Sequence, residues 1–240
     1  MDITRSVPVV TGANRGLGRS IVEALLERGV PKVYALARDP MTVRPDRRVV
    51  TVTFDLLDVD SISEAARRTS DATLLINNAA TAAFGGPIEA DLVAIRREMT
   101  VNYEGLYTTI RAYVPVLEAN GDGHIVNVLS LLSLASLSPM AGYSASKAAA
   151  HSLTQAVRPV LASKGIAVHG VYPGGIDTDM MAGVEAPKTA PGEVAAGILD
   201  GLEADQEDIF PDPNAQAMSQ LWLGDPKSFE RAFAAMAAAA

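Results

Sequence analysis

The chain has 240 residues, of which 48% are hydrophobic and 20% are charged, so it is long and apolar enough to bury a large core in one α/β unit. Its formal net charge of −8 argues against binding to nucleic acid or to an anionic membrane surface. The absence of cysteine excludes disulfides and thiolate metal sites, and the three scattered histidines predict no metal centre.

Short β-branched runs alternate along the chain with longer segments of helical spacing. This alternation predicts right-handed βαβ units in a single doubly wound Rossmann domain over residues 1–240, with a parallel sheet of about seven strands and helices on both faces. The expected strands are 7–11, 32–37, 49–54, 73–76, 125–128, 166–172 and 208–210. The expected helices are 17–28, 61–69, 91–119 and 143–163, followed by an atypical helical tail over 214–240 with an interruption near 224–226.

The beginning of the chain enters a strand almost at once and leaves no room for a signal peptide. No apolar run reaches the roughly 20 residues of a membrane span. We therefore expect a soluble, cytoplasmic protein.

A glycine-rich turn, TGANRGLG at residues 11–18, lies between the first expected strand and the first helix. Glycines there allow a tight turn and a close approach of the backbone to a pyrophosphate, which rests on the positive end of the helix dipole. The position of the turn predicts a dinucleotide site. Its expected contacts are Gly12, Asn14, Arg15, Gly16, Leu17 and Gly18.

Tyr143 and Lys147 lie four residues apart on an expected helix, with Ser130 thirteen residues upstream of the tyrosine. Positions i and i+4 share one face of a helix, and a cation beside a phenol lowers the phenol's pKa from about 10. The pair therefore suits a general acid that protonates a carbonyl oxygen and, in reverse, deprotonates an alcohol. The alternative is an ordinary solvated helix face.

Further short motifs follow the later strands in a fixed order. They are Asp55, Asn77-Asn78-Ala79-Ala80, Asn102, Ser130, Tyr143, Lys147, Pro173-Gly174 and Thr178. With the TGxxxGxG spacing of the glycine loop, residues 7 to about 180 resemble the short-chain dehydrogenase/reductase family, in its NADP-preferring, carbonyl-reductase-like branch.

The resemblance implies a role for each catalytic side chain. Tyr143 would donate the proton, Lys147 would hold the nicotinamide ribose and lower the tyrosine pKa, and Ser130 would polarise the carbonyl. Asn102 would hold a water that links Lys147 to solvent, although it could also simply interrupt a long helix. Ser133, Ser136 and Ser138 are alternatives to Ser130. The further cofactor contacts implied are Arg38, Asp55, Leu56, Asn78, Ala79, Ala80, Tyr143, Lys147, Pro173, Gly174, Ile176 and Thr178.

The end of the second strand indicates which nucleotide is bound. NAD-preferring relatives carry an acid there that accepts from the ribose 2′-hydroxyl, whereas this chain has Ala37 followed by Arg38. Arg38 and Arg15 together suit a 2′-phosphate, which favours NADPH/NADP+ as the cofactor. The alternative is that both arginines are plain surface residues and Asp39 serves as the acid, one position late.

The leading functional hypothesis is an NADPH-dependent reductase of small or medium ketones and aldehydes. Alternatives are a 3-oxoacyl-thioester reductase, which would need a basic surface for its carrier, and a non-catalytic nucleotide-binding regulator, which would typically lose Tyr143 or Lys147. A halohydrin-dehalogenase-like enzyme would need a different residue at Lys147 and an altered nucleotide loop.

The short segment between Thr178 and Pro191 predicts a small lid and an open substrate pocket, which Met140, Met180 and Met181 could line.

The expected assembly is a homodimer or homotetramer formed through the helices 91–119 and 143–163. The first of these carries more apolar residues than one sheet face needs: Leu92, Ile95, Tyr103, Leu106, Ile110, Tyr113 and Leu117. Relatives usually end in a strand with an Asp-Gly-Gly signature that builds an interface. Here Phe210-Pro211-Asp212-Pro213 and the helical tail replace that ending, which puts the tetramer in doubt.

Overall fold

A computed structural model describes residues 1–238, so the last two residues of the predicted tail lie outside the described part of the chain. Seven parallel strands form one sheet in the order β3-β2-β1-β4-β5-β6-β7. The strands are β1 (Pro8–Thr11), β2 (Val33–Ala37), β3 (Val49–Thr53), β4 (Leu74–Asn77), β5 (Gly123–Val128), β6 (Ile166–Val171) and β7 (Asp208–Ile209). The predicted doubly wound fold is confirmed, and the strand order reverses between β1 and β4, where such sheets bind ligands.

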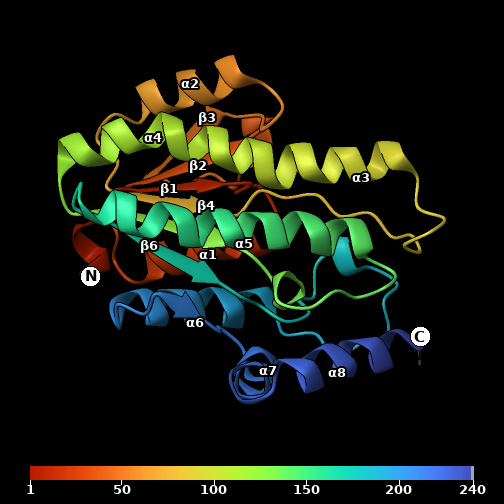
Figure 1. The fold of residues 1–240 in the computed structure, drawn as a ribbon. Helices are drawn as coiled ribbons and strands as arrows, with labels where there is room; N and C mark the ends of the chain where they lie inside the picture. Colours follow the sequence, from red (N-terminus) through yellow and green to blue (C-terminus); the bar gives the residue numbers. More distant parts are fainter. Residues whose placement is uncertain (239–240) are drawn as a thin grey trace.

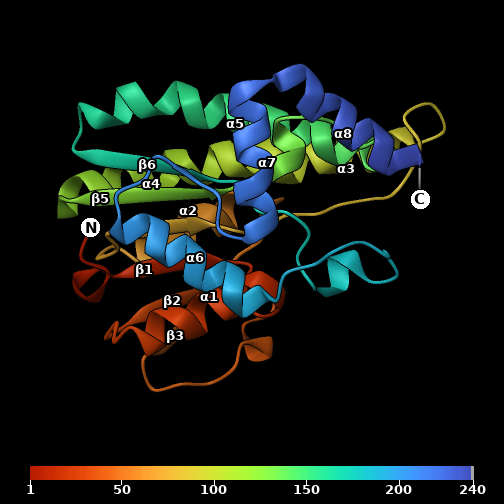
Figure 2. The same cartoon turned by 90° about the horizontal axis from the view of Figure 1, so that it is seen from below.

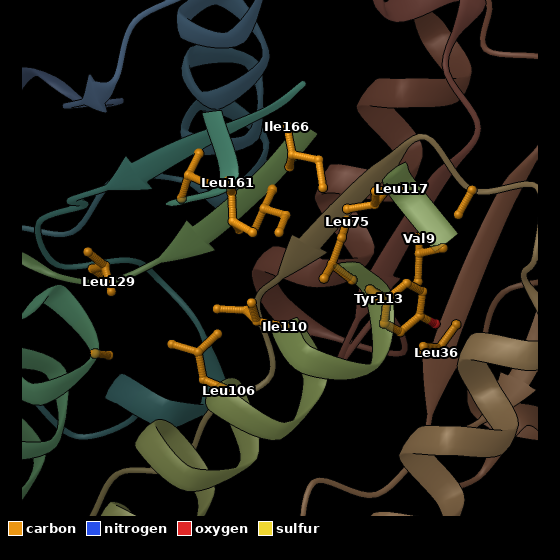
Figure 3. Close-up of a cluster of buried hydrophobic side chains, with 14 of the residues drawn as sticks. Val9, Leu36, Leu75, Leu106, Ile110, Tyr113, Leu117, Leu129, Leu161 and Ile166 are labelled. Carbon is orange, nitrogen blue, oxygen red and sulfur yellow. The ribbon is translucent and has the colours of Figure 1, made fainter. Parts of the chain in front are cut away.

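Helices cover both faces of the sheet. Figure 1 shows α1 (Gly16–Glu27) and α6 (Pro191–Glu203) on one face. The other face carries α2 (Val59–Arg68), α4 (Leu106–Asn120) and α5 (Ala141–Ala162). Each face buries its own apolar cluster, and Figure 3 shows the cluster under α4 and α5, where Ile110, Tyr113 and Leu117 meet Leu75 of β4. These helices therefore hold the carboxyl ends of the strands in fixed positions.

Helix α6 has no counterpart among the predicted helices, although its sequence carries the pattern. Pro191 occupies its first turn, and the side chains of its buried stripe recur at helical spacing. That stripe consists of Val194, Ala195, Ile198, Leu199 and Leu202. It packs in the apolar cluster that also contains the buried face of α1, and Arg28, just after α1, forms ion pairs with Asp200 and Glu203.

The single helix predicted over 91–119 is divided. It consists of α3 (Leu92–Met99), a π-helical turn η3 (Thr100–Gly105) and α4. π-helical turns inside α-helices are frequently found at functional sites. Four of the apolar residues expected at an interface, Leu106, Ile110, Tyr113 and Leu117, are buried in the core of this chain. The expected homo-oligomer stays a prediction, and those four side chains no longer support it.

The tail consists of α7 (Pro213–Gly224) and α8 (Pro226–Ala238), separated at the predicted interruption. The strand before it is the two-residue β7, one residue shorter than predicted. Figures 1 and 2 both show α8 beyond the edge of the sheet toward which the strands point. The tail therefore lies at the edge where the loops after the strands meet.

The remaining described elements are four short 3₁₀ turns, η1 (Ile3–Arg5), η2 (Pro40–Thr42), η4 (Leu131–Ser133) and η5 (Asp179–Met181). Across residues 1–238, no helix combines the length and apolar character that a membrane crossing requires.

Candidate active site

A cavity of about 480 Å³ runs along the carboxyl edge of the sheet. It is bounded by the loops after β1 to β6 and by the tail helices. The structure brings every predicted cofactor contact to this cavity. These residues are Gly12, Asn14, Arg15, Gly16, Leu17, Gly18, Arg38, Asp55, Leu56, Asn78, Ala79, Ala80, Tyr143, Lys147, Pro173, Gly174, Ile176 and Thr178.

The glycine loop forms a cradle at the N-terminus of α1. Gly12 has a φ of +68°, and a Cβ at Gly18 would lie 2.2 Å from the Gly12 carbonyl oxygen, so a larger residue at position 18 would force the backbone to move. The Thr11 hydroxyl accepts from the backbone N–H groups of Asn78 (2.9 Å) and Ala79 (3.0 Å), and the Asn78 side-chain amide donates to the Thr11 carbonyl at 2.9 Å. The cradle and the helix dipole fit a diphosphate group.

The loop after β2 presents a cation to the cavity. Arg38 is exposed and lines the cavity, whereas Asp39 does not line it. The Asp39 carboxylate instead accepts from the Met41 N–H at 3.0 Å and caps η2. Arg15 lies in the same cavity, where its guanidinium pairs with the exposed Asp179 at 3.3 Å. The geometry thus places two arginines, and not Asp39, at this end.

Helix α5 carries Tyr143 and Lys147 into the cavity from one face. The buried Lys147 ammonium donates to the Val128 carbonyl at 2.8 Å and lies 5.7 Å from the centre of the Tyr143 ring. Burial lowers the pKa of Lys147 to about 8. Burial also raises the pKa of Tyr143 to about 12, opposed by an interaction with the Ser130 hydroxyl. The sequence predicts the opposite direction for the tyrosine, because the loss of solvent around the phenol depends on tertiary packing.

Ser130 follows β5 and lines the cavity beside Tyr143. Its hydroxyl accepts from the Leu132 N–H at 3.1 Å and so caps η4. The other three serines weighed for this role, Ser133, Ser136 and Ser138, do not line the cavity. Ser133 instead donates its hydroxyl to the Ser130 carbonyl.

Asn102 is the one predicted catalytic residue whose side chain is not brought to the cavity. It is buried in the π-helical turn η3. Its amide oxygen accepts from the Thr81 N–H at 2.9 Å, and its amide nitrogen donates to the Thr81 carbonyl at 2.8 Å and to the Ser146 hydroxyl at 2.9 Å. The Asn102 side chain therefore links the loop after β4, through Thr81, to Ser146 of α5. The water-holding role implied for Asn102 stays a prediction.

Glu98 is a buried carboxyl group near the site that the sequence analysis does not identify. Its side chain accepts from the Ala83 N–H at 2.7 Å, and a Cβ at Gly142 would lie 2.3 Å from its second oxygen. Burial raises the pKa of Glu98, and its negative charge contributes to the raised pKa of Tyr143. No pattern around position 98 distinguishes it from a surface acid of an amphipathic helix, because Ala83 and Gly142 are distant in sequence.

Much of the cavity lining outside the glycine loop is apolar, although Arg97 and Asn214 also line the cavity. The apolar lining comes largely from the segments after β5 and β6 and from α8. The apolar residues there include Leu131, Leu132, Leu137, Met140, Met180, Met181, Ala186, Pro187, Phe233 and Met236. The segment 178–191 is short, as noted above, but α8 adds a wall that the prediction of an open pocket does not include. The aromatic residues of the tail are visible in the sequence, whereas their place at the cavity is not.

Comparisons with known proteins identify the family and support the fold. The family model described as short chain dehydrogenase matches residues 6–189. A crystal structure of a short-chain dehydrogenase from Burkholderia cenocepacia in complex with NADP is similar, with 41% identity and a TM-score of 0.92, over 97% of this chain and 99% of that one. A short-chain dehydrogenase from Sphingobium yanoikuyae in complex with NADPH is 25% identical, with a TM-score of 0.79 over 93% and 94% of the two chains.

A curated relative is also similar. The cis-4-hydroxycyclohexanecarboxylate dehydrogenase of Sinomonas cyclohexanicum is 33% identical over 191 residues, which are 75% of this chain and 77% of that protein. The uncharacterized oxidoreductase SSP0419 of Staphylococcus saprophyticus is 32% identical over 193 residues, 75% of this chain and 82% of that protein.

Proposed function

This chain belongs to the short-chain dehydrogenase family, and on that premise we propose that it reversibly reduces a ketone or aldehyde to the alcohol with NADPH. The observation that carries the proposal is the meeting of Ser130, Tyr143 and Lys147 in the cavity that also contains the glycine cradle. The cradle holds a diphosphate, and the three side chains act on a carbonyl group next to it.

The cofactor, when bound, supplies a hydride to the carbonyl carbon. Tyr143 donates its hydroxyl proton to the carbonyl oxygen, and the Ser130 hydroxyl orients that oxygen by a hydrogen bond. With a pKa raised by burial to about 12, the Tyr143 phenol carries its proton at neutral pH, which is the form that the reductive step requires.

Lys147 acts beside the tyrosine as a buried donor. With a pKa of about 8, its amine is mostly protonated at neutral pH and can donate to a ribose hydroxyl as well as to the Val128 carbonyl. The ammonium also provides positive charge near the phenol, which helps the oxygen bear negative charge once the proton has left. Because Lys147 lies one helical turn after Tyr143, its ammonium is held near the Tyr143 ring and the Val128 carbonyl.

The nucleotide end supports NADPH in preference to NADH. Arg38 and Arg15 line the cavity, and Asp39 is engaged in capping η2. A 2′-phosphate would gain charge-assisted hydrogen bonds from guanidinium groups, whereas a free 2′-hydroxyl would lack its usual acidic partner. The similar proteins from B. cenocepacia and S. yanoikuyae are complexes with NADP and NADPH, which is consistent with this preference.

The substrate proposed is a small or medium carbonyl compound. The relative from S. cyclohexanicum is named for a secondary alcohol on a ring, and this supports the ketone–alcohol pair. A carrier-bound acyl thioester would need a basic docking surface, which a chain with a net charge of −8 disfavours. The presence of Ser130, Tyr143 and Lys147 together at the cavity argues against a non-catalytic regulator.

The test is an assay of NADPH absorbance loss with purified protein against a panel of ketones, aldehydes and acyl thioesters. We expect turnover of ketones or aldehydes, and a large loss of that turnover in Tyr143→Phe. Turnover restricted to acyl thioesters would favour the 3-oxoacyl reductase instead. Tight NADPH binding without turnover of any class would favour the regulator.

We further propose that the protein assembles as a homodimer or homotetramer through the segments 91–119 and 143–163, which contain α3, α4 and α5. Tyr107 on α4 and Val160 on α5 are apolar side chains that this chain leaves exposed. Multi-angle light scattering at micromolar concentration tests the assembly, and a monomer as the sole species would refute it.

A further inference from the structure

We propose that helix α8 is the substrate-selecting wall of the cavity, and that Phe233 and Met236 select carbonyl compounds with an apolar chain or ring beside the carbonyl group. This inference rests on the proposed function, because it names the substrate class for that same site. The segment after β6, by contrast, is short and supplies only part of the wall.

The strand order places the tail at the substrate end. Arg38 and Asp55 follow β2 and β3, at one end of the sheet, whereas the tail follows β7, at the other end beside β6. Ser130 follows β5, on the β6 side of the switch point. The cavity therefore runs from the nucleotide end to a part that the segments after β5 and β6 and the tail help to enclose, together with Arg97 of α3 and Val101 of η3.

Asp212 fixes the start of the tail to the loop after β6. This side chain is buried and accepts from the Gly174 N–H at 2.9 Å and from the Ala215 N–H at 2.9 Å, so it caps α7 and binds the loop at once. Asn214, two residues later, lines the cavity. The hydrogen bonds of Asp212 therefore hold the start of α7 next to the loop after β6, which lines the cavity.

Helix α8 is anchored by one aromatic residue and presents the next to the cavity. Phe229 is fully buried, and its ring centre lies 5.0 Å from that of Phe233. Phe233 is 6% exposed, packs in the core cluster with Leu129 and Leu131, and lines the cavity. Met236 follows at helical spacing, lines the cavity and is 49% exposed. Phe233 thus forms the inner wall and Met236 the rim.

The chemistry of this wall selects apolar groups. The apolar residues that line the cavity together with Phe233 and Met236 include leucines, methionines, an alanine and a proline, and Arg97 and Asn214 are polar members of the same lining. Burying a methylene group there gains about 0.8 kcal/mol of transfer free energy, which is on the order of a fourfold preference per carbon. Flexible methionines adapt to groups of different shape, so selection should follow apolar size more than exact outline.

The kinetic test uses a series of methyl ketones with lengthening alkyl chains and two matched pairs of variants. Phe233→Leu is paired with Phe229→Leu, since both rings lie on α8 and are buried but Phe229 does not line the cavity. Met236→Ala is paired with Leu223→Ala, since Leu223 is an exposed apolar residue of α7 outside the cavity. We expect kcat/KM of the wild type to rise by roughly two- to fourfold per methylene.

In Phe233→Leu and Met236→Ala, kcat/KM for the longest ketones should fall by about fivefold or more, while the shortest ketone changes less than about twofold. The two control variants should keep the wild-type dependence on chain length. Equal changes in both members of a pair, or unchanged selectivity in both cavity variants, would overturn the inference even if reductase activity is present.

A binding measurement separates this inference from the proposed function. Calorimetry follows the longest methyl ketone binding to protein saturated with NADP+, and NADPH fluorescence checks that all variants retain the cofactor. Weaker ketone binding in the two cavity variants alone supports α8 as an apolar binding wall. If no carbonyl is turned over in that case, the proposed function and the substrate selection fail, while the binding wall stands. Equal ketone affinity in all variants would refute the wall.

Discussion

The two ends of the cavity are built in different ways. At the nucleotide end, backbone geometry carries the function: the Gly12 turn, the close approach at Gly18 and the N-terminus of α1. At the substrate end, side chains from distant segments meet, such as Leu131, Met180 and Phe233. A backbone cradle needs particular residues at fixed spacing, whereas an apolar wall needs only fitting side chains. Sequence motifs therefore describe the first end well and the second poorly.

Tyr143→Phe should have the largest effect, because it should abolish most activity while leaving cofactor binding at the nucleotide end nearly unchanged. The change removes the proton that the phenol donates but leaves the glycine cradle intact, so we expect activity to fall by about 10² to 10⁴. NADPH affinity, measured by fluorescence titration, should stay within a few-fold of wild type. Activity within a few-fold of wild type would contradict the assignment of Tyr143 as the acid.

Gly18→Ala tests the close packing of the glycine cradle at the nucleotide end by adding a single methyl group. The added Cβ would lie 2.2 Å from the Gly12 carbonyl oxygen, a backbone atom that cannot move without opening the cradle. We expect a cost of about 1–3 kcal/mol, seen as weaker NADPH binding or lower stability. Gly192→Ala is the matched control, because nothing lies within 4 Å of a Cβ at that position of α6. Equal behaviour of the two variants would disprove the role of close packing at Gly18.

Ala37→Asp combined with Arg38→Ala should change cofactor preference without affecting the substrate end. An acid at the end of β2 accepts from a free ribose hydroxyl and repels a phosphate, and the loss of Arg38 removes a cation. We expect a shift toward NADH of at least roughly tenfold, about 1.4 kcal/mol. Steady-state kinetics with both cofactors measure the shift. A wild type that already prefers NADH would show that the Arg38 interpretation is wrong.

The buried Lys147 should make the free energy of unfolding depend on pH. Its folded pKa of about 8 lies below the ordinary value of 10.5, so between these values the unfolded chain binds more protons and the free energy of unfolding rises with pH. Lys147→Met removes this contribution. The stability of the variant relative to wild type should therefore be highest near pH 7 and decrease toward pH 10, by up to about 1.4 kcal/mol per pH unit.

Urea unfolding of the ligand-free protein at several pH values measures this difference, with unfolding free energies compared at each pH. A difference that is independent of pH would show that Lys147 titrates alike in the folded and unfolded chain.

The contrast between the ends also explains what the sequence could predict. The strands and the glycine cradle follow from local spacing, whereas the other predicted nucleotide contacts come from the family resemblance. The structure brings these residues to one cavity. Helix α6 carries a buried apolar stripe from Val194 to Leu202 at helical spacing, although it is not among the predicted helices. The raised pKa of Tyr143, the buried Glu98 and the place of Phe233 depend on partners far along the chain, which local spacing does not identify.

The all-parallel sheet has a consequence for how the chain reaches this state. Its central strand β4 pairs with β1 through Ile76 and Val10, and within residues 1–238 no two neighbouring strands are joined by a hairpin. Each connection must therefore lose conformational entropy before its two strands can pair. This makes folding slow and leaves β-branched strands exposed in folding intermediates. Refolding yield should accordingly fall as protein concentration rises, because such strands associate between chains before the sheet is complete.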